Sequence, residues 1–191
     1  MVWLVIGLIV FFSIHSVRII NDDFRSRFIA EKGKLAWRGL YGVLSLLGLG
    51  LIIYGFGEAR ADPVFLWNPP LWTRHAAALL VFIAFLLLAA GNIPRNHIKQ
   101  KLGHPMFAGT KIWAFAHLIA NGSLGDTLLF GCFLIWAIAG FSVSRRRDRK
   151  AGVIYEQGSL FGTAMVSSAA TVLYAIFAFF LHRLLIGVSP F

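Results

Sequence analysis

Only one cysteine and eight acidic residues occur among the 191 residues, and this scarcity excludes several kinds of site. Cys132 has no second thiol for an internal disulfide and no CxxC spacing for a metal site, so we interpret it as a small residue in an apolar run. The acidic residues all lie in predicted loops or at the ends of apolar runs. Because the sequence has no carboxylate pair, serine triad or phosphate-binding glycine loop, general acid–base hydrolysis has little support.

Charged residues of either sign make up only 14% of the chain, whereas 58% of the residues are hydrophobic and the mean hydropathy is +0.75. A soluble domain of this length needs far more polar surface, so the composition predicts an integral membrane protein whose partner is the lipid bilayer. The net charge of +10 does not indicate nucleic-acid binding, because the basic residues lie between apolar runs.

The apolar runs predict an all-α fold, a polytopic membrane helix bundle that forms one domain over residues 1–191. A membrane-spanning helix needs about 20 apolar residues. Six segments meet or approach this length: 2–20, 38–56, 75–95, 105–122, 124–143 and 160–188. A tight turn at 121–123 separates the fourth segment from the fifth, so we expect these two to form a helical hairpin.

The basic residues are strongly biased to one side of this predicted bundle. Six lie in 18–38, four in 95–111 and five in 144–159, whereas Arg60, Arg74 and Arg183 lie on the opposite side. Short loops rich in Lys and Arg stay in the cytoplasm. We therefore expect three basic cytoplasmic loops and both termini outside.

The stretch from Gly103 to Asn121 is apolar enough for a bilayer, yet it contains ionisable side chains. Each charge at the membrane centre costs roughly 2.5 kcal/mol or more, so such residues indicate a functional site that faces the bundle interior. His104 precedes Pro105 and is expected at the N-cap of the helix. His117 lies thirteen residues further on, a rotation of about 220°, so the two histidines point to different faces. His117 shares its face with Trp113 and is the better candidate for a buried ligand.

His15 is the other histidine expected at depth, and Arg18 shares its helix face at i, i+3. Such a pair suits an anionic cofactor, with the imidazole nitrogen on a metal and the guanidinium on a carboxylate. A histidine hydrogen-bonded to another helix is an equally good interpretation. Neutral imidazole commonly ligates metals and haem, and helices of a bundle can hold haem between histidines. We interpret the other three histidines as interfacial: His75, His97 and His182.

Four segments are spread over most of the chain, in this order: HSVR at 15–18, KLAWRGLYGVLSLLGLGLIIYGF at 34–56, HPMFAGTKIWAFAHLIANG at 104–122, and the run RRRDRK. Together they resemble the NnrU family. The family is associated with denitrification, through nitrite and nitric oxide reduction, and is related to the plant zeta-carotene isomerase. That membrane enzyme is proposed to hold haem b and to isomerise a cis double bond without net redox change.

The resemblance implies haem b as cofactor, with His15 and His117 as its metal ligands. We predict Arg18, Trp113 and His104 as further cofactor-binding residues. The resemblance also implies a hydrophobic polyene as substrate and a bacterial inner membrane as location. Ala114 occupies the position of a cysteine that is proposed as an alternative ligand in the isomerase. We therefore expect haem binding to be retained without the ligand exchange.

Two alternative functions stay open. One is a non-enzymatic membrane assembly factor, which the scarcity of acid–base groups at depth favours over hydrolysis or transport. The other is a methyltransferase that uses S-adenosylmethionine, because residues 104–109 resemble the RHPxYxG element of isoprenylcysteine and phospholipid methyltransferases. Three features differ from that pattern: Gly103 replaces the arginine, Phe107 replaces the tyrosine, and Glu156 stands alone where paired glutamates are expected.

Overall fold

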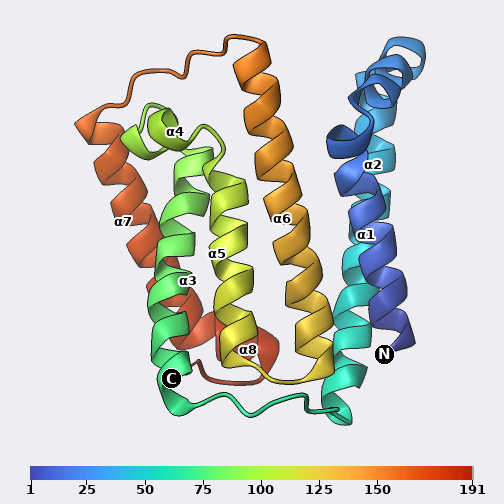
Figure 1. The fold of residues 1–191 in the computed structure, drawn as a ribbon, viewed down its shortest axis with the longest axis vertical. Helices are drawn as coiled ribbons and strands as arrows, with labels where there is room; N and C mark the ends of the chain where they lie inside the picture. The colour runs from blue at the N-terminus through green and yellow to red at the C-terminus, as the bar shows by residue number, and fades with distance from the viewer. Residues whose placement is uncertain (191) are drawn as a thin grey trace. The chain divides into compact units, whose positions relative to one another are not determined.

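The computed structural model describes residues 1–190, most of which are helical, as the sequence predicts (Figure 1). The elements in chain order are α1 (Val2–Ile20), α2 (Asp22–Ala61), α3 (Leu71–Asn92), α4 (His97–Leu102), α5 (Pro105–Ala120), α6 (Leu124–Lys150), α7 (Leu160–Ile176), the π-helical turn η1 (Phe177–Leu181) and α8 (His182–Ile186). The extended structure in the described part is one isolated bridge between Phe65 and Ser123.

Five helical segments within residues 1–190 are long and apolar enough to cross a membrane, namely α1, α2, α3, α6 and the continuous segment Leu160–Ile186. The fourth predicted span, 105–122, corresponds to α5, which has 16 residues. A helix of this length rises about 24 Å, less than the ~30 Å of a typical hydrocarbon core. The membrane character of the chain is thus supported by five helices, and the count of six stays a prediction.

Two predicted loops are partly wrong, because 18–37 is helical almost throughout and 144–159 is helical as far as Lys150. Asn21 caps α2 by accepting a hydrogen bond from the backbone amide of Phe24 at 2.9 Å, so helix begins at once within the predicted loop 18–37. The φ of +86° at Gly33 then kinks α2 before its apolar part. The predicted loop 144–159 begins as helix, because α6 continues to Lys150. Arg and Lys are good helix formers, and positive charge is favourable at a helix C-terminus.

The chain divides into two compact units, and the first comprises residues 1–67 and 123–132. Helices α1 and α2 are antiparallel within it and pack along their lengths (Figure 1). Glycines let the two backbones approach closely. A Cβ atom on Gly7 would lie 2.6 Å from the backbone nitrogen of Ile52, and one on Gly48 would lie 2.7 Å from that of Phe11. This small-residue contact is typical of helix pairs in membranes.

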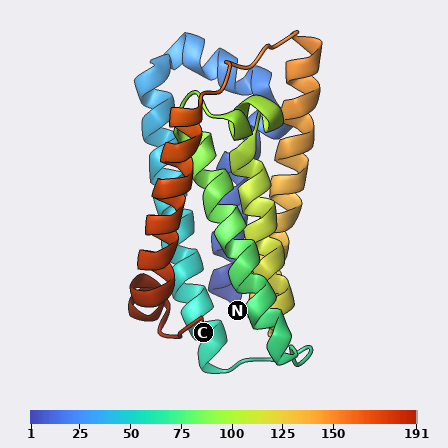
Figure 2. The same cartoon turned by 90° about the vertical axis from the view of Figure 1, so that its left-hand side faces the viewer.

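The second unit comprises residues 68–122 and the chain from residue 133 onward. Helix α3 lies between α5 and α7, and the short helix α4 packs at the ends of all three (Figures 1 and 2). Phe107 of α5 packs against Trp136 of α6, with ring centroids 5.1 Å apart. Asn96, only 1% exposed, ends the α3–α4 connection by donating to the carbonyl oxygens of Ala90 and Ile93.

Candidate functional site

His15 lies in the first unit, within α1, and its ring is held by aromatic neighbours. The ring stacks on Phe11 with centroids 3.9 Å apart and lies 5.0 Å from the ring of Tyr41. Its Nδ1 is 2.7 Å from the carbonyl oxygen of Phe11. A carbonyl can only accept a hydrogen bond, so Nδ1 carries the proton and the lone pair of the neutral ring is on Nε2. Metal-ligating histidines commonly have this arrangement, in which one ring nitrogen donates to a carbonyl and the other coordinates.

Arg18 follows His15 on the same helix, as the sequence predicts, and lies near its end. Its Nε is 3.8 Å from Asp22 Oδ1, and its side chain is 61% exposed. An ion pair at this distance and exposure contributes little to stability. The guanidinium is thus held only weakly near the end of α1, and its role toward a cofactor carboxylate stays a prediction.

His117 lies in the second unit, near the end of α5, and repeats the arrangement seen at His15. Its Nδ1 is 2.9 Å from the carbonyl oxygen of Trp113, four residues earlier. The rings of these two residues have centroids 5.1 Å apart, and Trp113 also meets Phe133 edge-on at 5.4 Å. Asn121 donates to the carbonyl oxygen of His117 at 2.9 Å. His117 and Trp113 therefore share one face of α5, as the sequence predicts.

The donor set of both histidines fits a metal ligand of the haem type. In each ring the Nδ1 proton is directed to the carbonyl four residues earlier, which places the coordinating lone pair on Nε2. No group of three or more His, Cys, Asp or Glu side chains suited to a metal ion occurs in the part of the chain that the structure describes. Axial ligation of haem requires only one or two such side chains.

His104 occupies the N-cap of α5 with Pro105 at the first helical position, as predicted. Its imidazole does not cap the helix, and it has partners different from those of His117. Nε2 lies 2.6 Å from Asp148 Oδ2, and the hydroxyl of Tyr155 donates to the same oxygen. The side chains of His104 and Asp148 are 23% and 17% exposed. This His104–Asp148–Tyr155 cluster joins the start of α5, the end of α6 and the segment after it.

The cluster fixes the protonation of two of its members, which lie beyond the apolar run of α6. The hydrogen bond from Tyr155 lowers the pKa of Asp148, with further lowering by His104 and Arg147, and these effects outweigh the burial that raises it. Burial, together with the bond to Asp148, raises the pKa of Tyr155. Asp148 is therefore a carboxylate at neutral pH, and Tyr155 is a protonated donor.

Sequence reasoning missed Asp148 and Tyr155, because the contact between His104 and Asp148 joins residues 44 positions apart. The one available signal is that Asp148 is the single acid in the run RRRDRK. Gly103 contributes to the same contact. It has a φ of +73°, and a Cβ atom there would collide with the Tyr155 ring. The glycine that departs from the methyltransferase pattern is thus required by the packing.

Lys111 and two of the remaining histidines, His97 and His182, have ordinary partners. Lys111 places its Nζ 3.9 Å from the centroid of the Phe141 ring, which is a cation–π contact. His97 Nδ1 lies 2.8 Å from Thr163 Oγ1, and His182 Nδ1 lies 2.7 Å from a backbone carbonyl oxygen.

A comparison with protein families finds that the model of the NnrU protein family matches residues 3–190. No curated protein and no solved structure matches the chain. The match extends over both compact units and includes every helix described above apart from the first residue of α1. The chain therefore belongs to the NnrU family.

Proposed function

We propose that this NnrU-family membrane protein binds haem b, which the imidazoles of His15 and His117 would hold through its iron. The observation that supports the proposal is the shared arrangement of the two imidazoles. Each directs its Nδ1 proton to the carbonyl oxygen four residues earlier, at 2.7 Å for His15 and 2.9 Å for His117. This bond fixes the tautomer, orients the ring and makes Nε2 the ligating atom.

The neighbours of each histidine suit a flat, conjugated and largely apolar cofactor. Phe11 and Tyr41 border His15, while Trp113 borders His117. Bound haem supplies an iron centre that can exchange an electron or polarise a substrate. The chain's own residues bind and orient it: the imidazoles supply nitrogen, the aromatic rings supply apolar contact, and Arg18 supplies a cation for a carboxylate. His104 has no ligand role in this proposal, because its imidazole belongs to the cluster with Asp148.

We further propose that any chemistry acts on a hydrophobic molecule dissolved in the membrane, such as the cis-trans isomerisation of a polyene. The support is the family resemblance together with the five apolar helices, because a long polyene dissolves in the hydrocarbon region. A contribution to nitrite or nitric oxide reduction is the other role that the family implies. A non-enzymatic assembly factor is the main alternative, and a bacterial inner membrane is the proposed location.

The test is a visible spectrum of the detergent-purified protein, produced with ample haem supply, before and after reduction with dithionite. Bis-histidine haem b should give a shifted Soret band and a sharp α-band on reduction. A spectrum without these bands, from protein whose circular dichroism shows intact helices, would contradict the proposal.

Calorimetric titration with S-adenosylmethionine distinguishes the methyltransferase alternative from the haem proposal. The haem proposal expects no binding in the wild type. Binding that is lost in His104→Ala would instead favour the methyltransferase.

A further inference from the structure

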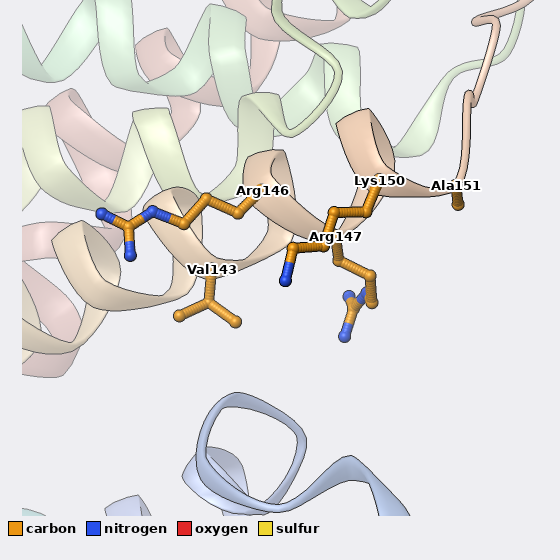
Figure 3. Close-up of a pocket in the computed structure, with 5 residues that line it drawn as sticks. All are labelled: Val143, Arg146, Arg147, Lys150 and Ala151. Atoms are coloured by element: carbon orange, nitrogen blue, oxygen red, sulfur yellow. The ribbon is translucent and has the colours of Figure 1, made fainter.

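The last turns of α6 present a basic pocket at the end of the apolar run. The pocket has a volume of about 530 Å³ and is lined by Val143, Arg146, Arg147, Lys150 and Ala151. Figure 3 shows these five side chains along the end of α6. We define these residues as the α6 basic pocket. It combines three cations with an apolar edge.

Helix geometry explains why positive charge accumulates on this face. Residues 143, 146, 147 and 150 are spaced i, i+3, i+4 and i+7, which places them on one side of a helix. Asp148, the one acid in this run, lies roughly 150° from the centre of that face at 100° per residue. Its carboxylate instead binds Tyr155 and His104. The acid of the run is therefore directed away from the pocket.

The position of the pocket along α6 corresponds to the level of lipid headgroups. The apolar part of α6 runs from Leu124 to Val143, about the 20 residues that cross the hydrocarbon core. Arg146 follows within one turn. Ile135 lies three turns before Arg146 on nearly the same side of the helix and is 71% exposed. A lipid with its phosphate at Arg146 would thus find an exposed apolar side chain along the path of its acyl chain.

We propose that the α6 basic pocket binds the phosphate group of an anionic phospholipid in the cytoplasmic leaflet. Guanidinium groups match phosphate oxygens with paired, charge-assisted hydrogen bonds, and the lysine adds a point charge. Val143, on the membrane side of the cations, contacts the apolar part of the same molecule. Anionic headgroups are enriched on the cytoplasmic side, where basic pockets of membrane proteins bind them. The proposal does not depend on haem binding.

The experiment is a lipid titration of the full chain in detergent, followed by native mass spectrometry. The probes are dioleoyl-phosphatidylglycerol and dioleoyl-phosphatidylcholine. The wild type should bind phosphatidylglycerol about ten-fold more tightly, and the double variant Arg146→Gln/Lys150→Gln should lose most of this preference. The double variant Lys32→Gln/Lys34→Gln removes the same amount of charge from exposed positions in α2 and should keep the preference for phosphatidylglycerol.

Three outcomes would overturn the proposal. The first is that Arg146→Gln/Lys150→Gln keeps the preference for phosphatidylglycerol while its thermal unfolding matches that of the wild type. The second is that Lys32→Gln/Lys34→Gln loses as much of this preference as the pocket variant does. The third is displacement of phosphatidylglycerol by millimolar inorganic phosphate, which would assign the pocket to a free anion. If Arg146→Gln/Lys150→Gln does not fold, Arg146→Lys/Lys150→Arg replaces it as the test. This variant keeps the charge and should retain the preference for phosphatidylglycerol, and loss of the preference would overturn the proposal.

Discussion

His104 and Asp148 lie 2.6 Å apart, Nε2 to Oδ2, although 44 positions separate them in the sequence. Because Tyr155 donates to the same carboxylate oxygen, one acid binds two donors from different segments. The cluster holds the start of α5 against the end of α6. It gives the second unit a fixed polar contact beyond the apolar run.

Tyr155→Phe should lower the free energy of unfolding by about 1 kcal/mol, because it removes a donor to a charged and partly buried acceptor. The measurement is thermal or denaturant unfolding in detergent. Tyr174→Phe is a useful comparison, since the Tyr174 hydroxyl donates to the neutral carbonyl of Ala78 at 3.0 Å. That variant should lose less stability, and an equal or larger loss would contradict the charged character of the Asp148 contact.

Stability should fall at acid pH through Asp148, whose pKa is lowered in the folded protein. Its stabilising contribution is present above the pKa of the unfolded carboxyl, about 4, and is lost as the pH falls through the lower folded pKa. Asp148→Asn should therefore unfold with a shallower dependence on pH below about 4 than the wild type. Unfolding curves that shift in parallel for the two proteins would contradict the lowered pKa.

The contact between α1 and α2 should tolerate no side chain at Gly48. Gly48→Ala places a Cβ atom 2.7 Å from the backbone nitrogen of Phe11 and should cost about 1–3 kcal/mol of stability. Gly50→Ala is the matched control, because nothing lies within 4 Å of its Cβ position. Helix propensity predicts that this control is neutral or up to about 1 kcal/mol more stable. Equal losses for the two variants would rule out the close backbone contact.

The charge bias predicts that the end of α6 is cytoplasmic and that Asp62 is outside. In a Cys132→Ser background, Asp62→Cys should react with an impermeant maleimide in intact spheroplasts. Arg149→Cys should react only after permeabilisation. Both positions are exposed, so access depends on the side of the membrane. If Arg149→Cys reacted in intact spheroplasts and Asp62→Cys only after permeabilisation, the predicted topology would be contradicted.

Local patterns predicted much of the fold because they need no knowledge of distant contacts. The apolar run gave α1 its bounds of 2–20, and the His104–Pro105 pair marked the start of α5. The helix over 22–32 was missed because its signal is an Asn21 cap followed by basic residues, which were interpreted as a loop. The Asp148–Tyr155 contact depends on how α6 and the following segment pack, which no local spacing encodes.

The central claim is that His15 and His117 ligate haem b, and single variants of the haem-loaded protein test it most directly. The measurement is the reduced-minus-oxidised spectrum, normalised to protein, of His15→Ala, His117→Ala and the control His182→Ala, whose ring nitrogen binds a backbone carbonyl. We predict that the sharp α-band is lost or strongly weakened in the first two variants and unchanged in the control. An undiminished band in either His15→Ala or His117→Ala would contradict the ligand assignment.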